Sequence, residues 1–257
     1  METQSQQWEP RHFTAEEIER RNARRQLRRK QNNEEIAELF RQHPEEGRVL
    51  VHVGKCGGKS FKAALSETEK APFVLDVHQY KPPVDRTYKY WLLIRNPLDR
   101  TVSAFRWRYR LVVEEQKNLR NHVEQETFAK YATINDIAED LYGATGEPNP
   151  EAQRLFRGIG HIKTNLHFYL SELLDGTGVE QIEHVFLQEY LDEDLGRVLG
   201  VEKEYRLNDN RLSTWRDHLS KRGAANLRRA IEPDYAVVAR LFARGHIPAD
   251  RMPRLFT

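Results

Sequence analysis

The chain has 257 residues, of which 39% are hydrophobic and 31% charged, so it is long enough to bury one substantial core and polar enough to dissolve in water. A formal net charge of +2 is too small to indicate a nucleic-acid-binding protein, but it does not exclude a local basic pocket for a small anion. No apolar run approaches the roughly 20 residues of a membrane helix, and the N-terminus has no secretory signal. The single cysteine excludes an internal disulfide. We therefore expect a cytoplasmic protein with no membrane contact.

Residues 14–43 are expected to form a helix, because Thr14 and Glu17 have the spacing of a capping box. The middle of this helix, RRNARRQLRRK, is strongly basic and is flanked by acidic residues. We interpret it as a solvated or intersubunit helix, which leaves a homodimer open, and keep a nucleic-acid-binding arm or a membrane-surface helix as alternatives. The expected domains are an N-terminal helical extension, residues 1–47, and a single α/β domain, residues 48–257.

Beyond residue 47, short apolar runs alternate with helical patterns. The runs that predict buried strands are 49–53, 73–77, 88–94 and 184–188. Helices are expected over 61–69, 97–110, 111–141 with a break near 132–133, 155–174, 190–199 and 226–243, and the tail from Gly245 is expected to be irregular. This alternation indicates an α/β fold with a P-loop-like, mainly parallel sheet flanked by helices. Ligands of such sheets bind at the carboxyl ends of the strands.

The first strand runs into a glycine-rich loop, GKCGGKS, at residues 54–60, and a helix follows it. Convergent amides, a helix N-terminus and lysines make such a loop a cradle for a phosphate-like anion. The triphosphate-binding pattern G-x-x-x-x-G-K-[ST] fails by one residue, because its leading glycine would fall on Val53. A kinase also needs carboxylates for Mg²⁺, and Asp76 is the only good strand-end candidate. An ATP-dependent kinase therefore stays as a weaker alternative.

A second strand-to-helix junction, LLIRNPLDRTVSAFRWR, carries Arg95, Pro97, Arg100 and Ser103. Together with HVGKCGGKS it resembles the sulfotransferases that use 3′-phosphoadenosine-5′-phosphosulfate (PAPS), whose motifs are H-[IV]-P-K-T-G-G-T-S and R-x-P-x-x-R-x-x-S. The resemblance covers residues 48–110 and is closer to the carbohydrate-type, cytosolic bacterial-like branch than to the small-phenol branch. A cofactor charged at two separate places needs two anion sites, and the chain has two cationic junctions.

The resemblance implies a role for each matching residue. Lys55 would contact the oxygen that bridges phosphate and sulfate, and Ser60 would bind the 5′-phosphate. Arg95 and Ser103 would hold the 3′-phosphate, while Arg100 could contact the ligand or pair with an acid. The implied cofactor-binding set is Lys55, Cys56, Gly57, Gly58, Lys59, Ser60, Phe61, Arg95 and Ser103.

Three loop positions depart from the family pattern. Gly54 replaces a frequent proline, which should loosen the turn, and Lys59 stands where the family commonly has threonine. Cys56 replaces threonine or serine. A thiol near a helix start and two lysines could have a lowered pKa, although a small space-filling role is favoured.

Transfer to a hydroxyl or amine needs a general base, and we assign it to His78, which follows the second strand. The reserves are Asp76, His52, His161 and His167, and His52 is expected to be a core histidine. Trp107 could border the adenosine or acceptor pocket, or belong to the core.

The sequence thus predicts a PAPS-dependent, nucleotide-binding sulfotransferase with Lys55 and His78 as catalytic residues and no metal. It would transfer a sulfuryl group to a small-molecule or saccharide acceptor and release adenosine 3′,5′-bisphosphate. Residues 111–175 are expected to set acceptor specificity. The second alternative, from another class, is a non-catalytic scaffold or nucleic-acid-binding protein that uses the basic helix.

Overall fold

The centre of the fold is a four-stranded sheet in which all neighbouring strands are parallel. The structure, a computed structural model, describes residues 14–42, 47–68, 73–117, 121–201 and 219–256. The strands are β1 (Gly47–His52), β2 (Phe73–Val77), β3 (Lys89–Ile94) and β4 (Ile182–Leu187), in the order β2-β1-β3-β4. The prediction of an α/β fold with a parallel sheet is confirmed, and each expected strand is present to within two residues.

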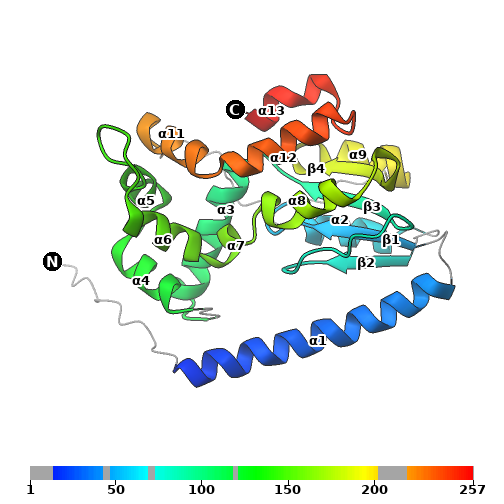
Figure 1. Cartoon of the computed structure of the whole chain (residues 1–257), viewed down its shortest axis with the longest axis horizontal. Coiled ribbons are helices and arrows are strands. Elements are labelled where there is room, and N and C mark those ends of the chain that lie inside the picture. Colours follow the sequence, from blue (N-terminus) through cyan, green and yellow to red (C-terminus); the bar gives the residue numbers. More distant parts are fainter. Residues whose placement is uncertain (1–13, 43–46, 69–72, 118–120, 202–218, 257) are drawn as a thin grey trace, which may run out of the picture.

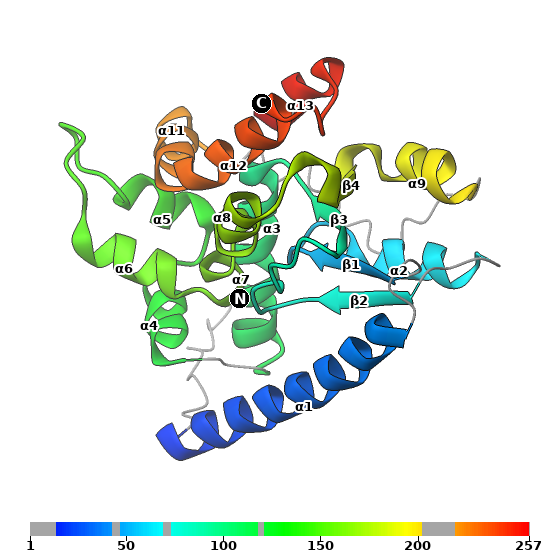
Figure 2. The same ribbon diagram turned by 45° about the vertical axis from the view of Figure 1, so that its right-hand side comes forward.

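The strands are apolar because both faces of the sheet are covered. Val49, Leu50 and Val51 are fully buried, as are Leu92 and Leu93 in β3, which is the pattern of a parallel sheet between helical layers. Helices α2 (Gly58–Ser66), α8 (Leu166–Gly176), α9 (Leu191–Leu199) and α12 (Glu232–Ala243) contribute to the same core. Helix α2 packs against α9, and α8 packs against α12 (Figures 1 and 2).

The long connection between β3 and β4 builds a second, helical core. Its helices are α3 (Pro97–Tyr109), which continues into a π-helical turn (Arg110–Glu114), α4 (His122–Lys130), α5 (Ile134–Asp140), α6 (Pro150–Gly158) and α7 (Gly160–Lys163), and α11 (Lys221–Ala230) packs on them. In Figure 1 this lobe lies to the left of the sheet. Because α3 begins at the carboxyl end of β3 and α7 packs on α3, the lobe borders the ligand edge of the sheet.

Helix α1 (Ala15–Gln42) lies along the β2 side of the molecule (Figures 1 and 2). Its start is the expected capping box, in which Thr14 N donates to Glu17 Oε2 at 3.0 Å and Glu17 N donates to Thr14 Oγ1 at 3.1 Å. Leu27, in the basic stretch, is 59% exposed. Of the helices that the structure describes, none combines the length and the apolar character needed to span a membrane.

The prediction of an irregular tail is wrong, because the chain ends in a 3₁₀ turn (Ala249–Arg251) and α13 (Met252–Phe256). Tertiary contacts explain this short helix: Arg251 pairs with Asp194 at 2.6 Å and with Glu193 at 2.5 Å. Asn96 also donates to the main-chain oxygen of Arg254 at 2.8 Å. A five-residue helix has little stability of its own, so its local sequence carries no usable signal.

Candidate anion-binding and catalytic site

The loop between β1 and α2 has the backbone geometry of an anion cradle. Lys55 and Gly57 have positive φ values of 75° and 88°, and Gly57 is the N-cap of α2 with no side-chain cap. The first amides of α2 are thus left uncapped by that residue at the positive end of the helix dipole. A left-handed lysine costs roughly 1–3 kcal/mol, and such strain is concentrated at functional sites. The loop is therefore suited to bind an anion.

Lys55 is the cation of this loop, and its side chain is held in place. Its amine nitrogen lies 4.5 Å from the centre of the Trp107 ring, a cation–π contact. Burial, followed by repulsion from Arg95 and Lys59, lowers the pKa of Lys55 to about 8. An anion in the cradle would raise that pKa again, so this lysine is sensitive to negative charge that arrives beside it.

The second junction, from β3 to α3, adjoins the first. Asn96 caps α3 by accepting from Leu98 N at 2.9 Å and Asp99 N at 3.2 Å, and Pro97 starts the helix. Arg95, only 7% exposed, donates from Nη1 to the main-chain oxygen of Lys55 at 3.3 Å. Its Nε has no hydrogen-bond partner in the described part of the chain. Thus the two cationic junctions of the sequence are in direct contact.

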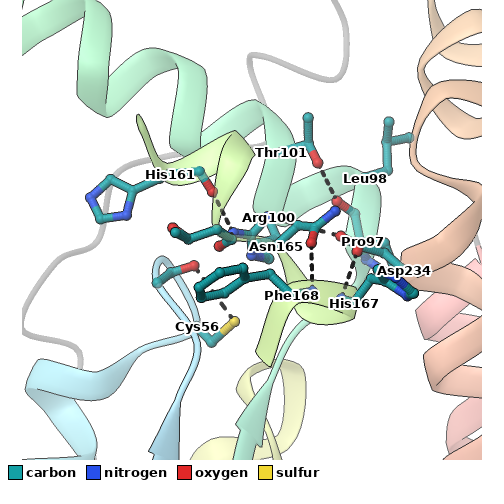
Figure 3. Close-up of polar contacts among 12 residues, drawn as sticks. Cys56, Pro97, Leu98, Arg100, Thr101, His161, Asn165, His167, Phe168 and Asp234 are labelled. Atoms are coloured by element: carbon teal, nitrogen blue, oxygen red, sulfur yellow. Dashed lines mark hydrogen bonds and ion pairs between the residues drawn. The ribbon is translucent and has the colours of Figure 1, made fainter. Parts of the chain in front are cut away.

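Arg100 is part of the framework, which answers the question that the sequence left open. Its guanidinium is fully buried, donates to the main-chain oxygens of His161 at 2.5 Å and Thr164 at 2.6 Å, and lies 4.0 Å from Asp234 (Figure 3). Asp234 in turn accepts from His167 N at 3.0 Å. Arg100 therefore ties α3 to α7 and α12.

His78 lies beside the loop and has a defined orientation. Its Nδ1 is 3.0 Å from the main-chain oxygen of His52, so Nδ1 carries the proton and Nε2 is an acceptor, which the side-chain amide of Gln79 faces at 3.4 Å. Burial and the neighbouring His52 lower the pKa of His78 to about 4. The imidazole is thus neutral at physiological pH, the form that a general base requires.

Two of the alternative candidates for the general base, His52 and His161, also lie beside His78. The rings of His52 and His78 stack at 4.4 Å, and the His161 ring lies 6.1 Å from that of His78. A Cβ on Gly54 would fall 2.7 Å from Nδ1 of His161, so the glycine leaves room for that ring. His167 is exposed, and its amide donates to Asp234. From the sequence, each histidine was assessed separately, and their meeting was not predicted. The small residue Gly54, which leaves room for the ring of His161, was the signal that was missed.

The interpretation of His52 as a core histidine is incomplete. Its Nδ1 lies 3.6 Å from Oδ1 of Asp76, and the other oxygen of Asp76 accepts from Lys62. Burial would raise the pKa of Asp76, but His52 and Lys62 hold it below its ordinary value. The Asp76 carboxylate is therefore charged, and both of its oxygens already face a basic side chain, His52 or Lys62.

The remaining residues of the predicted cofactor-binding set differ in whether their side chains are buried or exposed. Phe61 is fully buried against Phe186 and Trp91, so only its backbone is available to a ligand. The thiol of Cys56 is buried, faces the main-chain oxygen of Gly54, and has its pKa raised to about 12 by burial. The alternative of a lowered thiol pKa is therefore wrong. Gly58 and Ser60 are buried in the first turn of α2, Ser103 is buried near the middle of α3, and Lys59 is exposed.

Comparison with known proteins adds no assignment: no protein-family model, no curated protein and no solved structure matches the chain. Within the described residues, no three His, Cys, Asp or Glu side chains come together as a metal site.

Proposed function

We propose that the protein is a PAPS-dependent sulfotransferase that modifies a hydroxyl or amine of a small-molecule or saccharide acceptor in the cytoplasm. The observation that carries the proposal is the contact between the junctions, where Arg95 donates to the main-chain oxygen of Lys55. Two adjacent cationic sites, each at a helix start, suit a nucleotide with charge at two places.

The residues present fit such a nucleotide. The first turn of α2 has no side-chain cap, and Nε of Arg95 is a donor without a partner in the described residues. Arg95 and Ser103 would hold the 3′-phosphate, and the α2 amides with Ser60 would hold the 5′-phosphate. When bound, PAPS supplies an activated sulfuryl group. Lys55 would neutralise the charge that develops on the leaving phosphate oxygen.

His78 would take the acceptor proton at Nε2. Its Nδ1 is held by the His52 carbonyl, so the lone pair of Nε2 has a fixed direction. Positioning of the two substrates and neutralisation of the leaving group would supply the rest of the rate enhancement. The side chains around the acceptor would come from the lobe that follows β3, where His161 already reaches the loop.

The rival kinase function has less support. Asp76 lies at the carboxyl edge, as a Mg²⁺ ligand should, but its oxygens face Lys62 and His52. The loop is also one residue short of the triphosphate pattern. The alternative of a nucleic-acid-binding protein is supported by the basic stretch of α1.

A thermal-shift comparison tests the three functions, because a ligand of the native state raises its melting temperature. The protein is heated with adenosine 3′,5′-bisphosphate, with Mg·ATP, and with an oligonucleotide. We expect stabilisation by the bisphosphate. Stabilisation by Mg·ATP alone would favour the kinase, and stabilisation by the oligonucleotide alone would favour the basic helix. Transfer of labelled sulfate from PAPS to a panel of hydroxyl and amine acceptors then tests the reaction itself.

A further inference from the structure

His52 contacts more of the site than a core histidine would. One face of its ring stacks on His78 with 4.4 Å between ring centres and 18° between planes. Its Nδ1 faces Asp76 at 3.6 Å, which is longer than a hydrogen bond and makes the contact electrostatic. On the loop side, a Cβ on Gly58 would lie 1.8 Å from Nε2, so the ring occupies the space that this glycine leaves open.

The groups around His78, which directly follows β2, come from four other elements as well as from β2. His52 comes from β1 and Lys62 from α2, while His161 comes from α7. The hydroxyl of Tyr169, in α8, lies at this edge and accepts a hydrogen bond from Gln79 N at 2.6 Å. Asp76, two residues before His78, is the one carboxylate among the charged groups that act on its ring. His52 is the only one of these groups that covers the face of the His78 ring and touches the loop.

The stacked arrangement limits what His52 can do. The two rings meet through their faces, so no proton passes directly between their nitrogens. The ring of His52 can instead fix the plane of the His78 imidazole, and a charge on His52 would oppose a second charge 4.4 Å away.

We propose that His52, anchored by Asp76, is a positioning residue that keeps the His78 imidazole in one orientation and in its neutral form. This inference rests on the proposed function, since it assigns His52 to the base of that reaction. The acceptor proton moves to Nε2 of His78, the new O–S or N–S bond forms, and the S–O bond to the 5′-phosphate breaks with its electron pair on the phosphate. His52 stays outside the proton path.

Two substitutions at position 52 separate the two parts of its role. His52→Phe keeps a flat ring against His78 but removes the titratable group. His52→Asn keeps a polar partner for Asp76 but removes the ring. Titration of the His78 ring protons by NMR reports its pKa without any turnover, and the pH dependence of kcat reports catalysis. His122→Asn, which changes an exposed histidine on α4, is the control.

Both variants should raise the pKa of His78 by about one pH unit, because they remove the neighbouring imidazole that lowers it. His52→Asn should also lower the plateau of kcat about 10- to 100-fold, whereas His52→Phe should stay within about fivefold of wild type, since only the loss of the ring disturbs the base. The affinity for adenosine 3′,5′-bisphosphate should change little in either.

An unchanged His78 titration in both variants, or equal kcat losses in both, would overturn the inference. If one variant fails to fold, as its amide NMR spectrum would show, the pKa of His78 in the other variant still tests the inference. Failure of the proposed function looks different: no sulfate transfer by the wild type, with the His78 titration still responding to both substitutions.

Discussion

The amine of Lys55 lies over the ring of Trp107, which belongs to the helix that carries the second motif. The same lysine gives its main-chain oxygen to Arg95, at the start of that motif. Both ends of Lys55 are therefore held by the β3–α3 junction, which links the position of the loop cation to the arginine site next to it.

Trp107→Ala should release and hydrate the Lys55 amine. Burial is the largest cause of its low pKa, so that pKa should rise from about 8 toward the ordinary 10.5. Trp107→Phe keeps an aromatic face and should leave the pKa close to that of wild type. NMR titration of the lysine side-chain signals measures this directly, and an unchanged value in Trp107→Ala would show that the ring is not what desolvates the amine.

Lys55→Ala should lower kcat about 100- to 1,000-fold, the loss typical of removing one charge-stabilising donor. Binding of the bisphosphate should be retained or only weakened, because the amides and Arg95 remain. Lys221→Ala is the control, since Lys221 is an exposed lysine at the start of α11 and should leave kcat close to that of wild type. Turnover within a few-fold of wild type in Lys55→Ala would show that Lys55 is not catalytic.

The pH dependence of kcat/KM should be bell-shaped. The base must be neutral, so activity should fall as the pH drops through the His78 pKa of about 4. The lysine must be protonated, so activity should also fall as the pH rises through the Lys55 pKa of about 8. Lys55→Arg replaces the titrating amine by a group that stays charged, and should remove the alkaline limb. Survival of that limb would assign it to another residue.

Alanine substitutions of Arg95 and Arg100, which lie five residues apart, should have different effects: the first on ligand binding and the second on stability. Arg95→Ala should weaken bisphosphate binding about 10- to 100-fold by calorimetry, because it removes charged donors from the anion site, and should change stability little. Arg100→Ala should instead lower the free energy of unfolding by about 3–5 kcal/mol, since it leaves Asp234 buried without its partner. Unchanged affinity in Arg95→Ala would contradict its role in binding.

The strands were predictable because their signal is local: Val49, Leu50 and Val51 form an apolar run that suits a covered parallel strand. The loop and the second junction were also readable, since Gly57 and Pro97 have local conformational meaning. The cluster of His52, His78 and His161 could not be predicted from local sequence. Its members are separated by 26 and then 83 residues along the chain, and they meet only after the lobe has folded. For the same reason α13, which depends on Arg251 and its acidic partners, gave no signal.

Gly54 is the clearest place to test how distant residues meet at the site, because its Cα faces the ring of His161. In Gly54→Ala the new methyl group would start 2.7 Å from Nδ1 and 3.3 Å from Cε1 of a ring that is 5% exposed, so one of them must move. Overpacking of this kind costs about 1–3 kcal/mol, which urea denaturation would measure. Gly196→Ala, inside α9 with no contact closer than 3.5 Å, is the control and should be neutral or stabilising.

The double mutant Gly54→Ala/His161→Ala completes the test. His161→Ala alone should destabilise by removing a buried ring, but it also opens the space that the methyl group at position 54 needs. The two losses should therefore be less than additive by about 1 kcal/mol or more, the coupling expected of residues in contact. Additive losses would mean that Gly54 is kept for its backbone conformation and not for the ring above it.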